Sequence, residues 1–535
     1  MAHGDRRQLI KQGVAAGISG LLLEHRRSHA IPFEYQHLSG AKPFGIRVID
    51  EKTRRGIPLV ELRTTNDVRY YTDSAGWAAV TDPGLMRHKV YFNMSSPGYE
   101  HPKDSFGYAG FAVNVKPGAA VQVTMQRVNI AERIYRVTGE GIYDASVLLG
   151  HSAPIVRPLL NGDVMGQDSV QAVIYRGKIH WFWGDTARVS YPLGNFRTSG
   201  AVSDLPGKGG LNPQVGINLN YFVNSDGFCR PMCPLPNEHG GVVWIGGLTV
   251  LPDGAGRMRM MAHYSRRHGL GEVIEHGIAV WNDQRRIFEK YVVLPREVDW
   301  NAPNGQSALY ADRGVAYCLF SSPFPTVRVK ARLHDAADPA AYEAFTCLKT
   351  GTHFASDKTH LDRDSAGRII WKWRPHTPPI SQDQEAELIK LGLIEPHEAR
   401  LQVVDAATDS PVRIAGGSCC YNQYLRQWVL IGCQAGGVSF LGEIWCTVAK
   451  TPTGPWGKAV KVATHPHYSL YNPAHHPFFD QNNGKIMYFE GTYSVTFSGN
   501  DHPTPRYDYN QLMYRLDLSD DRLKVLRSGQ ANRTP

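Results

Sequence analysis

Hydrophobic residues along the chain fall in short runs, separated by clusters of Gly, Pro, Asp, Asn and Ser. This pattern predicts many short β-strands and few helices. Over residues 41–128 the runs are rich in β-branched and aromatic residues, as in FGIRVID, VRYYTD and HKVYFNM. Such a segment is typical of a small β-sandwich. It holds no cluster of carboxylates or nucleophiles, so we expect an accessory domain.

From residue 153 to 527 the pattern repeats in larger units, each of which begins with a hairpin. Five hairpins are marked by their turns, at 171–185, 242–265, 307–322, 419–434 and 475–493. More strand-like sequence follows each hairpin, so each unit reads as a four-stranded sheet. A spacing of roughly 60 to 110 residues accommodates propeller blades with insertions. The chain is therefore predicted to be all-β, a five-bladed β-propeller preceded by a small β-sandwich.

Two segments depart from the strand pattern. Residues 129–152 read as a connector that is partly helical. Residues 381–400 begin with Ser381 and Gln384 at capping-box positions and continue as a short helix. We expect a helical insertion between the third and fourth blades.

Two aspartates stand at the open end of the first hairpin. Asp168 and Asp185 are equidistant from the point between Arg176 and Gly177, where the chain turns, so they should face each other. Two like charges so close do not both ionise easily, and one carboxyl pKa should rise. A protonated carboxyl beside an ionised one is the pair that glycosidic cleavage needs. The alternative is a strand-ending turn in which Asp185 bonds its own backbone.

The last hairpin shows the same arrangement. His476 and Glu490 are equidistant from Asn483, in the middle of the turn QNNGK. In a propeller the strand that opens a blade and the strand that returns beside it meet at one mouth. The sequence thus predicts that His476 and Glu490 contact the substrate beside the aspartates. For His476 a hydrogen-bonded structural role is the alternative.

Aromatic and basic residues supply further candidates for substrate binding. Trp183 is expected to stack on a sugar, unless it packs between blades together with Trp181. Tyr264 and Arg266 close the second hairpin, where they would bind an acidic or hydroxyl-rich substrate or form a solvated edge.

The motifs have a recognisable order. HWFWGDT is followed by EHGGVVWIGGLTV, ARLHDAADPAAYEAF, TPTGPW and YNPAHHPFFD. Over 153–520 this order resembles the five-bladed propeller glycoside hydrolases of the arabinanase and fructosidase type, particularly the endo-D-arabinanase-like group. The resemblance implies that Asp168 and Asp185 act in catalysis. It leaves a third carboxylate without an unambiguous counterpart, and Glu238 is our first choice.

The same resemblance bears on cofactors and on the first domain. Propellers of this type sometimes hold a structural calcium ion on the axis, whereas no cofactor is required for the expected chemistry. Residues 41–128, with the order strand, TDSAGW, strand and SSPGYE, resemble the transthyretin-like or carboxypeptidase-regulatory domain.

The charge of the chain indicates which partners to expect, and its cysteines indicate whether disulfides form. The formal charge of the 535 residues is +9, and five basic against two acidic residues in the first thirty account for +3 of it. The remaining charge is scattered and no basic helix is present, so nucleic acid is not an expected partner. All eight cysteines lie between Cys229 and Cys446. Cys420 and Cys433 flank a hairpin and would pair across it if oxidised, but a structural role for all eight is favoured.

Residues 1–30 read as a targeting segment. DRRQLIKQG resembles a bacterial twin-arginine export signal, and a short apolar run follows, with cleavage expected after Ala30. The alternative to an export signal is a disordered basic N-terminus. No other run is long and apolar enough for a membrane span. We therefore expect a periplasmic or secreted protein without an integral membrane segment after cleavage.

Three functions compete at this point. The first is an exported glycoside hydrolase that degrades a polysaccharide or oligosaccharide. The second is a propeller polysaccharide lyase in which Tyr264 and His476 act as base and acid while Arg266 neutralises a uronate. The third is a carbohydrate-binding surface protein without catalysis, which has no need of a like-charge pair.

Overall fold

The computed structural model describes residues 42–195, 197–235, 240–295, 300–303 and 305–528. Strands dominate these ranges and the helices are short, so the chain is all-β, as the hydrophobic pattern predicts. Within the same ranges no helix combines the length and the apolar character that a membrane crossing needs. The expected signal segment and Glu238 lie outside the described residues.

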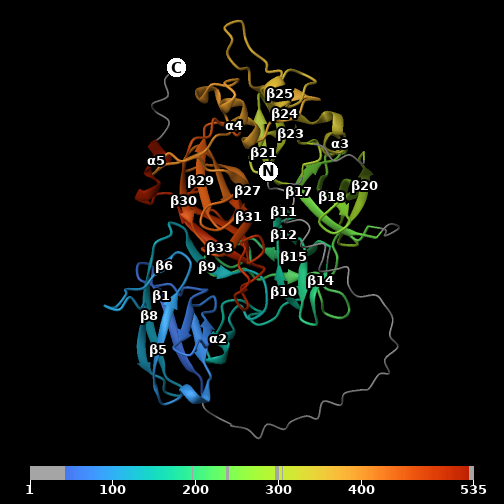
Figure 1. Ribbon diagram of the computed structural model, residues 1–535. Coiled ribbons are helices and arrows are strands. Elements are labelled where there is room, and N and C mark those ends of the chain that lie inside the picture. Colours follow the sequence, from blue (N-terminus) through green and yellow to red (C-terminus); the bar gives the residue numbers. More distant parts are fainter. Residues whose placement is uncertain (1–41, 196, 236–239, 296–299, 304, 529–535) are drawn as a thin grey trace, which may run out of the picture. The chain divides into compact units, whose positions relative to one another are not determined.

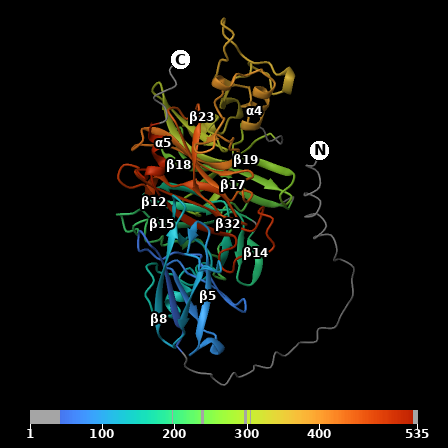
Figure 2. The same cartoon turned by 60° about the vertical axis from the view of Figure 1, so that its left-hand side comes forward.

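The segment predicted to be a β-sandwich forms two four-stranded sheets, with strand orders β4-β1-β8-β6 and β3-β2-β5-β7. Blue strands of both sheets lie next to one another in Figure 1 and in Figure 2. The strands are β1 (Phe44–Asp50), β2 (Glu61–Thr64), β3 (Arg69–Tyr71), β4 (Trp77–Val80), β5 (Lys89–Ser95), β6 (Tyr99–Glu100), β7 (Gly110–Asn114) and β8 (Ala120–Arg127). Alternate residues of β5 are buried, and Ile46, Leu62 and Phe92 from both sheets share one core. Each sheet thus covers the apolar face of the other.

Five further sheets follow, which we number in chain order. Sheet one contains β11 (Gln171–Tyr175), β12 (Lys178–Trp183), β15 (Ser199–Asp204) and β16 (Asn220–Tyr221). Sheet two contains β17 (Val242–Pro252), β18 (Met258–Arg267), β19 (Val273–Asn282) and β20 (Ile287–Val293). Sheet three contains β21 (Gln306–Asp312), β22 (Val315–Ser321), β23 (Val327–Lys330), β24 (Glu343–Thr346) and β25 (Lys372–Pro375).

The last two sheets end the chain. Sheet four contains β26 (Val404–Asp405), β27 (Ile414–Asn422), β28 (Gln427–Gln434), β29 (Ile444–Ala449) and β30 (Lys458–Ala463). Sheet five contains β31 (Ser469–His475), β32 (Ile486–Ser494), β33 (Asn510–Asp517) and β9 (Glu132–Arg136). A small extra sheet beside sheet one contains β10 (Val164–Gln167), β13 (Thr186–Arg188) and β14 (Tyr191–Asn195).

Each of the five sheets packs on the next, and sheet five packs on sheet one. The second strand of each hairpin, such as β28 or β32, shows why, because both faces of this strand are buried. In β28, Val429 and Ile431 face the core shared with sheet five, whereas Leu430 faces the core shared with sheet three. In β32, Phe489 faces sheet four and Tyr488 faces sheet one. Strands that are buried on both faces have continuous apolar sequences. The first strands of the five hairpins contact one another in the order β11, β17, β21, β27 and β31 (Figure 1).

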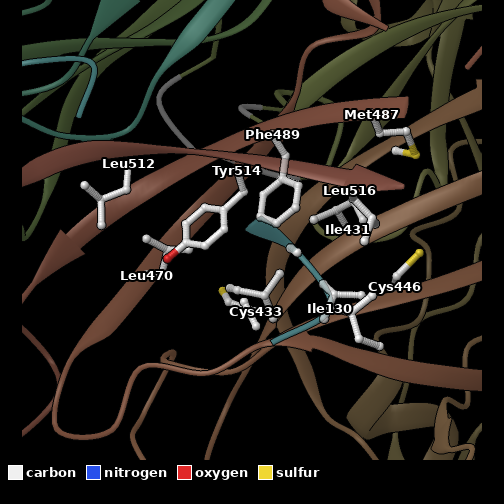
Figure 3. Packing of buried hydrophobic residues seen from close by; sticks show 14 of the residues in the cluster. Ile130, Ile431, Cys433, Cys446, Leu470, Met487, Phe489, Leu512, Tyr514 and Leu516 are labelled. Carbon is white, nitrogen blue, oxygen red and sulfur yellow. The ribbon is translucent and has the colours of Figure 1, made fainter. Parts of the chain in front are cut away.

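The core between sheets four and five is shown in Figure 3. Ile431, Cys433 and Cys446 from sheet four meet Phe489 and Leu516 from sheet five there. Each fully buried apolar side chain of this kind contributes roughly 1.5–3 kcal/mol relative to an exposed one.

The connector 129–152 departs from the expected partly helical segment. It contains the short helix α2 (Asp144–Leu148), but it also contains strand β9, which pairs with β33. The Arg133 guanidinium from β9 donates to the Pro58 carbonyl at 2.9 and 3.1 Å. These bonds connect the segment that contains β1–β8 to sheet five. All five residues of Glu132–Arg136 are buried, because β9 pairs with β33 on one side and contacts the segment that contains Thr53 and Pro58 on the other.

The segment after β25 holds helix α4 (Gln382–Lys390). The Ser381 hydroxyl accepts from the Gln384 N–H at 3.1 Å, and the Gln384 side chain accepts from the Ser381 N–H at 2.9 Å. This is the capping box that the sequence predicts. The helix lies between sheets three and four in chain order.

The first three predicted hairpins coincide with the strand pairs β11–β12, β17–β18 and β21–β22, whereas the fourth and the fifth begin earlier than expected. Strand β27 begins at Ile414 rather than at Cys419. Strand β31 begins at Ser469 rather than at His475. Asn472 adopts a left-handed φ of 49°, and the register shifts between Tyr471 and Ala474. Because Pro473 interrupts the apolar run at this bulge, the sequence conceals the first half of the strand.

Candidate active site

The first hairpin holds Asp168 and Asp185 in the predicted register. Arg176 (φ 50°) and Gly177 (φ 77°) form the two-residue turn between β11 and β12. The pairing of Gln171 with Phe182, and of Gln167 with Thr186 farther out, keeps one register through the gap between the two ladders. Asp168 and Asp185 therefore lie directly opposite each other.

Both aspartates line a cavity of about 510 Å³. The walls come from sheets one to five, namely from β11, β17, β21, β27 and β31 with adjoining loops and from parts of β18, β19 and β22. Among the lining residues that carry polar or aromatic side chains are Asp168, Asp185, Trp244, His263, Tyr264 and Arg267. Its volume lies within the range of sites for small ligands.

Asp168 is held by three hydrogen-bond donors. Its Oδ1 accepts from the Asp185 N–H at 3.0 Å, and its Oδ2 accepts from the Tyr471 hydroxyl at 3.0 Å. The Tyr509 hydroxyl also donates to this carboxylate. Burial and the charge of Asp185 raise the pKa of Asp168 to about 6, although the three donors oppose the rise.

Asp185 has a different environment. Its Oδ1 accepts from the Trp244 indole N–H at 2.8 Å. Burial raises the pKa of this carboxyl as well, and the Trp244 hydrogen bond partly offsets the rise. Since both carboxyls resist ionisation, the pair holds a proton at a pH where an ordinary aspartate has lost it.

Gly184 permits the close approach of the two strands. Its N–H donates to the Asp168 carbonyl at 2.8 Å. A Cβ at position 184 would lie 2.2 Å from Asp168 Oδ1, so any side chain there would displace the carboxylate. The glycine of the GDT motif therefore has a steric role beside the aspartate that follows it.

Sequence reasoning missed Tyr471 and Tyr509 as partners of Asp168. Both stand in the sequence of the last sheet, more than three hundred residues from Asp168, and Tyr509 has a left-handed φ of 58°. Nothing in the hydrophobic pattern distinguishes them from core tyrosines. Their role follows only from the packing of sheet five against sheet one.

His476 and Glu490 do not reach the cavity, which corrects the prediction that all four groups share one mouth. His476 Nε2 lies 2.7 Å from Glu490 Oε1, and both residues are buried. The His476 ring packs against Trp181 and Phe478 in the core between sheets five and one. Glu490 pairs with Ala474, because the 3-10 turn Pro477–Phe479 lies between the end of β31 and the turn at Gln481–Ile486, so the counting from Asn483 is off by two residues.

Trp183 is also a core residue and not a sugar platform. It is 1% exposed and stacks on Trp181 with ring centroids 6.4 Å apart. Successive side chains of β12 alternate between two cores, and Trp181 and Trp183 both face sheet five. The alternative interpretation of these tryptophans, packing between sheets, is correct. Trp244 is the tryptophan that lines the cavity.

Tyr264 and Arg266 are separated by the structure. Tyr264 lines the cavity, and its hydroxyl donates to Glu275 Oε1 at 3.1 Å. Arg266 is buried and is not among the lining residues, and its guanidinium donates to the Gly240 carbonyl at 3.2 Å. The two side chains therefore do not form one substrate-binding pair.

A structural calcium ion on the axis stays a prediction. No group of three or more His, Cys, Asp or Glu side chains in the part of the chain that the structure describes could hold a metal ion. We therefore derive no step through a metal.

No family model matches the chain, and no curated protein matches it. Solved structures with a partial likeness include a GH43_1 enzyme from Xanthomonas citri complexed with xylose, with 11% identity, 66% of this chain and 87% of that chain covered, and a TM-score of 0.32. A putative exo-beta-1,3-galactanase from Bifidobacterium bifidum has 9% identity, with 72% of this chain and 92% of that chain covered, and a TM-score of 0.31.

A third example is an exo-beta-1,3-galactanase from Phanerochaete chrysosporium with galactose. Its identity is 10%, it covers 66% of this chain and 61% of its own, and its TM-score is 0.32. Structural similarities with TM-scores of 0.31 and 0.32 give no evidence for the function of this chain.

Proposed function

We propose that the protein is an exported glycoside hydrolase that cleaves glycosidic bonds in a polysaccharide or oligosaccharide. In this proposal sheets one to five are the blades of a five-bladed β-propeller over residues 153–527, and β9 completes the last blade. The two sheets within 41–128 form a β-sandwich accessory domain. The cavity that contains Asp168 and Asp185 is the active site.

One observation carries the proposal. Asp168 and Asp185 lie opposite each other, both line the cavity, and the pKa of Asp168 is raised to about 6. The pair therefore offers a proton and a negative charge within one site at mildly acidic pH. Hydrolysis of a glycoside needs these two groups, a carboxylic acid and a carboxylate.

The chemical steps follow from the pair. The protonated carboxyl gives its proton to the glycosidic oxygen, and the bond from that oxygen to the anomeric carbon breaks. The ionised carboxylate either takes a proton from an attacking water or itself attacks the anomeric carbon, after which water releases the sugar. The donors around Asp168 and the Trp244 N–H to Asp185 hold both carboxyls in place for these steps.

The lyase hypothesis has less support. It requires Tyr264, Arg266 and His476 around one uronate, but only Tyr264 lines the cavity. His476 is bonded to Glu490 in the core. A binding protein without catalysis remains the third alternative, and it gives no reason for a like-charge pair in the cavity.

Export is proposed from the N-terminal pattern alone, with the two adjacent arginines, the short apolar run and Ala30 as the cleavage point. Mass spectrometry of the protein secreted from its host checks it. We expect the mature protein to begin directly after Ala30. A secreted protein that still contains residues 1–30 would contradict this proposal.

The activity is tested with a panel of neutral and uronate-containing polysaccharides. New reducing ends without ultraviolet absorbance are expected for a hydrolase, whereas absorbance from unsaturated uronates identifies a lyase. Binding without either signal identifies a recognition protein. Asp168→Asn tested in parallel shows whether any activity depends on the pair.

A further inference from the structure

Cys420 differs from the other seven cysteines of the chain. Those seven are buried, whereas Cys420 is partly exposed. Burial raises the pKa of six of the buried thiols to about 12, and that of the seventh is raised too. Buried neutral thiols of this kind are unreactive. Cys420 also cannot pair with Cys433 across the hairpin, because β27 and β28 place Cys420 opposite Val429.

The Cys420 side chain lies on the face of β27 that meets sheet five. His475 ends β31, and its backbone N–H donates to the Ser418 hydroxyl at 2.7 Å. Ser418 and Cys420 stand two positions apart on β27, so they point to the same side. Cys419, between them, faces the core shared with sheet three. The thiol of Cys420 and the ring of His475 are therefore neighbours across the contact between β27 and β31.

The His475 ring is oriented by a carboxylate. Its Nε2 lies 2.9 Å from Asp480 Oδ1, and its side chain is 1% exposed. The other ring nitrogen, Nδ1, is buried and has no partner within hydrogen-bond distance among the described residues. Burial lowers the pKa of His475, but Asp480 and Cys420 outweigh burial and raise it to about 10. The ring is therefore an imidazolium at neutral pH, and Nδ1 is the ring nitrogen that Asp480 does not hold.

We propose that Cys420, His475 and Asp480 form a reactive-thiol site that is modified by low-molecular-weight disulfides. An imidazolium beside a thiol stabilises the thiolate, which is the nucleophilic form. Asp480 fixes the ring, so the order of nucleophile, histidine and orienting carboxylate is the one found in activated nucleophiles. Cys420 is not among the residues that line the cavity, so the site is separate from the proposed active site.

The modification is a thiol–disulfide exchange. The Cys420 thiolate attacks one sulfur of a disulfide R–S–S–R, and a bond forms between Sγ and that sulfur. The original S–S bond breaks, and RS⁻ leaves and takes a proton from water. Cys420 is oxidised to a mixed disulfide, and one half of the small disulfide is reduced to a thiol, so electrons and atoms balance.

The test uses the folded, full-length protein and oxidised glutathione, with peptide mass spectrometry to identify the modified residue. One mixed disulfide per chain is expected, at Cys420, and Cys420→Ser should abolish it. His475→Gln and Asp480→Asn should each slow the reaction about tenfold or more. Cys433→Ser serves as the matched control and should leave rate and stoichiometry unchanged, because Cys433 is buried.

The pH profile separates activation from simple exposure. The described groups that act on His475 are Asp480 and Cys420. The modification rates of wild type and His475→Gln are measured from about pH 7 to pH 9, and wild type should react faster than His475→Gln throughout. Variants that react as fast as wild type over this range would overturn the proposal, as would modification of another cysteine. If His475→Gln exposes buried thiols because it misfolds, the Asp480→Asn rate decides.

Discussion

Two hairpins, in sheets one and five, were expected to present acidic groups in the same way, but the structure uses them differently. In sheet one, Asp168 and Asp185 open to a cavity of about 510 Å³ and each is held by a donor from another sheet. In sheet five, His476 Nε2 contacts Glu490 Oε1 at 2.7 Å inside the core, away from the cavity. Ionisable side chains equidistant from a turn therefore do not by themselves indicate a site. A site requires the register to hold and the strand ends to stay uncovered.

The largest expected effect concerns the cavity pair. Asp168→Asn and Asp185→Asn should each lower the turnover of a glycoside substrate by about a hundredfold or more, because positioned acid–base groups commonly contribute 10²–10⁴. Steady-state kinetics measure it, with circular dichroism to check the fold. Asp409→Asn is the matched control, since Asp409 is exposed and pairs with Lys458 on the surface. Full activity in both cavity variants would remove the proposed mechanism.

The core pair should affect stability and not chemistry. Glu490→Ala leaves His476 buried without its partner and should lower the free energy of unfolding by about 3–5 kcal/mol. Urea unfolding measures the loss, and the activity per folded molecule should stay near that of wild type. If the variant loses activity while its stability is unchanged, Glu490 belongs to the site after all.

The pH dependence of stability should distinguish the two hairpins further. Asp168 has a folded-state pKa of about 6 against an ordinary value of 3.8, so the folded protein keeps a proton that the unfolded chain releases. Its contribution to stability is fully present below about pH 4 and is lost as the pH rises to about 6, by at most about 3 kcal/mol. Unfolding of wild type and Asp168→Asn across this range measures the difference. Parallel curves would contradict the raised pKa.

The smallest effect concerns one hydrogen bond. Trp244→Phe removes the donor to Asp185 and should raise the pKa of that carboxyl further, since the bond favours its charged form. A loss of about three- to tenfold in activity is expected, with the acid limb of the pH–rate profile displaced to higher pH. Trp183→Phe is the control, because the Trp183 indole N–H lies in the core and has no hydrogen-bond partner among the described residues. Equal profiles for the two variants would show that Trp244 only fills space.

The sequence was sufficient for the elements whose pattern is local. The all-β class, the hairpins and the capping box at Ser381 follow from strand periodicity and turn chemistry, and the opposition of Asp168 to Asp185 follows from a two-residue turn without a bulge. The placement of His476 could not be predicted, because a 3-10 turn at Pro477–Phe479 follows it where the sequence pattern predicts a strand. The donors Tyr471 and Tyr509 were missed because contacts between sheets leave no periodic trace. Strand β9 was missed because all five of its residues are buried, which leaves no alternation of apolar and polar residues, and because its partner β33 lies far along the chain.

Strand β9 has a consequence for biosynthesis. Its partner β33 is the last strand that the structure describes, so the buried residues of β9 cannot pair until Asn510–Asp517 has been synthesised. Closing a loop of this length costs entropy before its contacts are gained, which makes the step slow. Until then the edge of β9 and the apolar faces of the finished sheets are exposed to other chains. We therefore expect the nascent protein to need protection from aggregation until β33 has paired with β9.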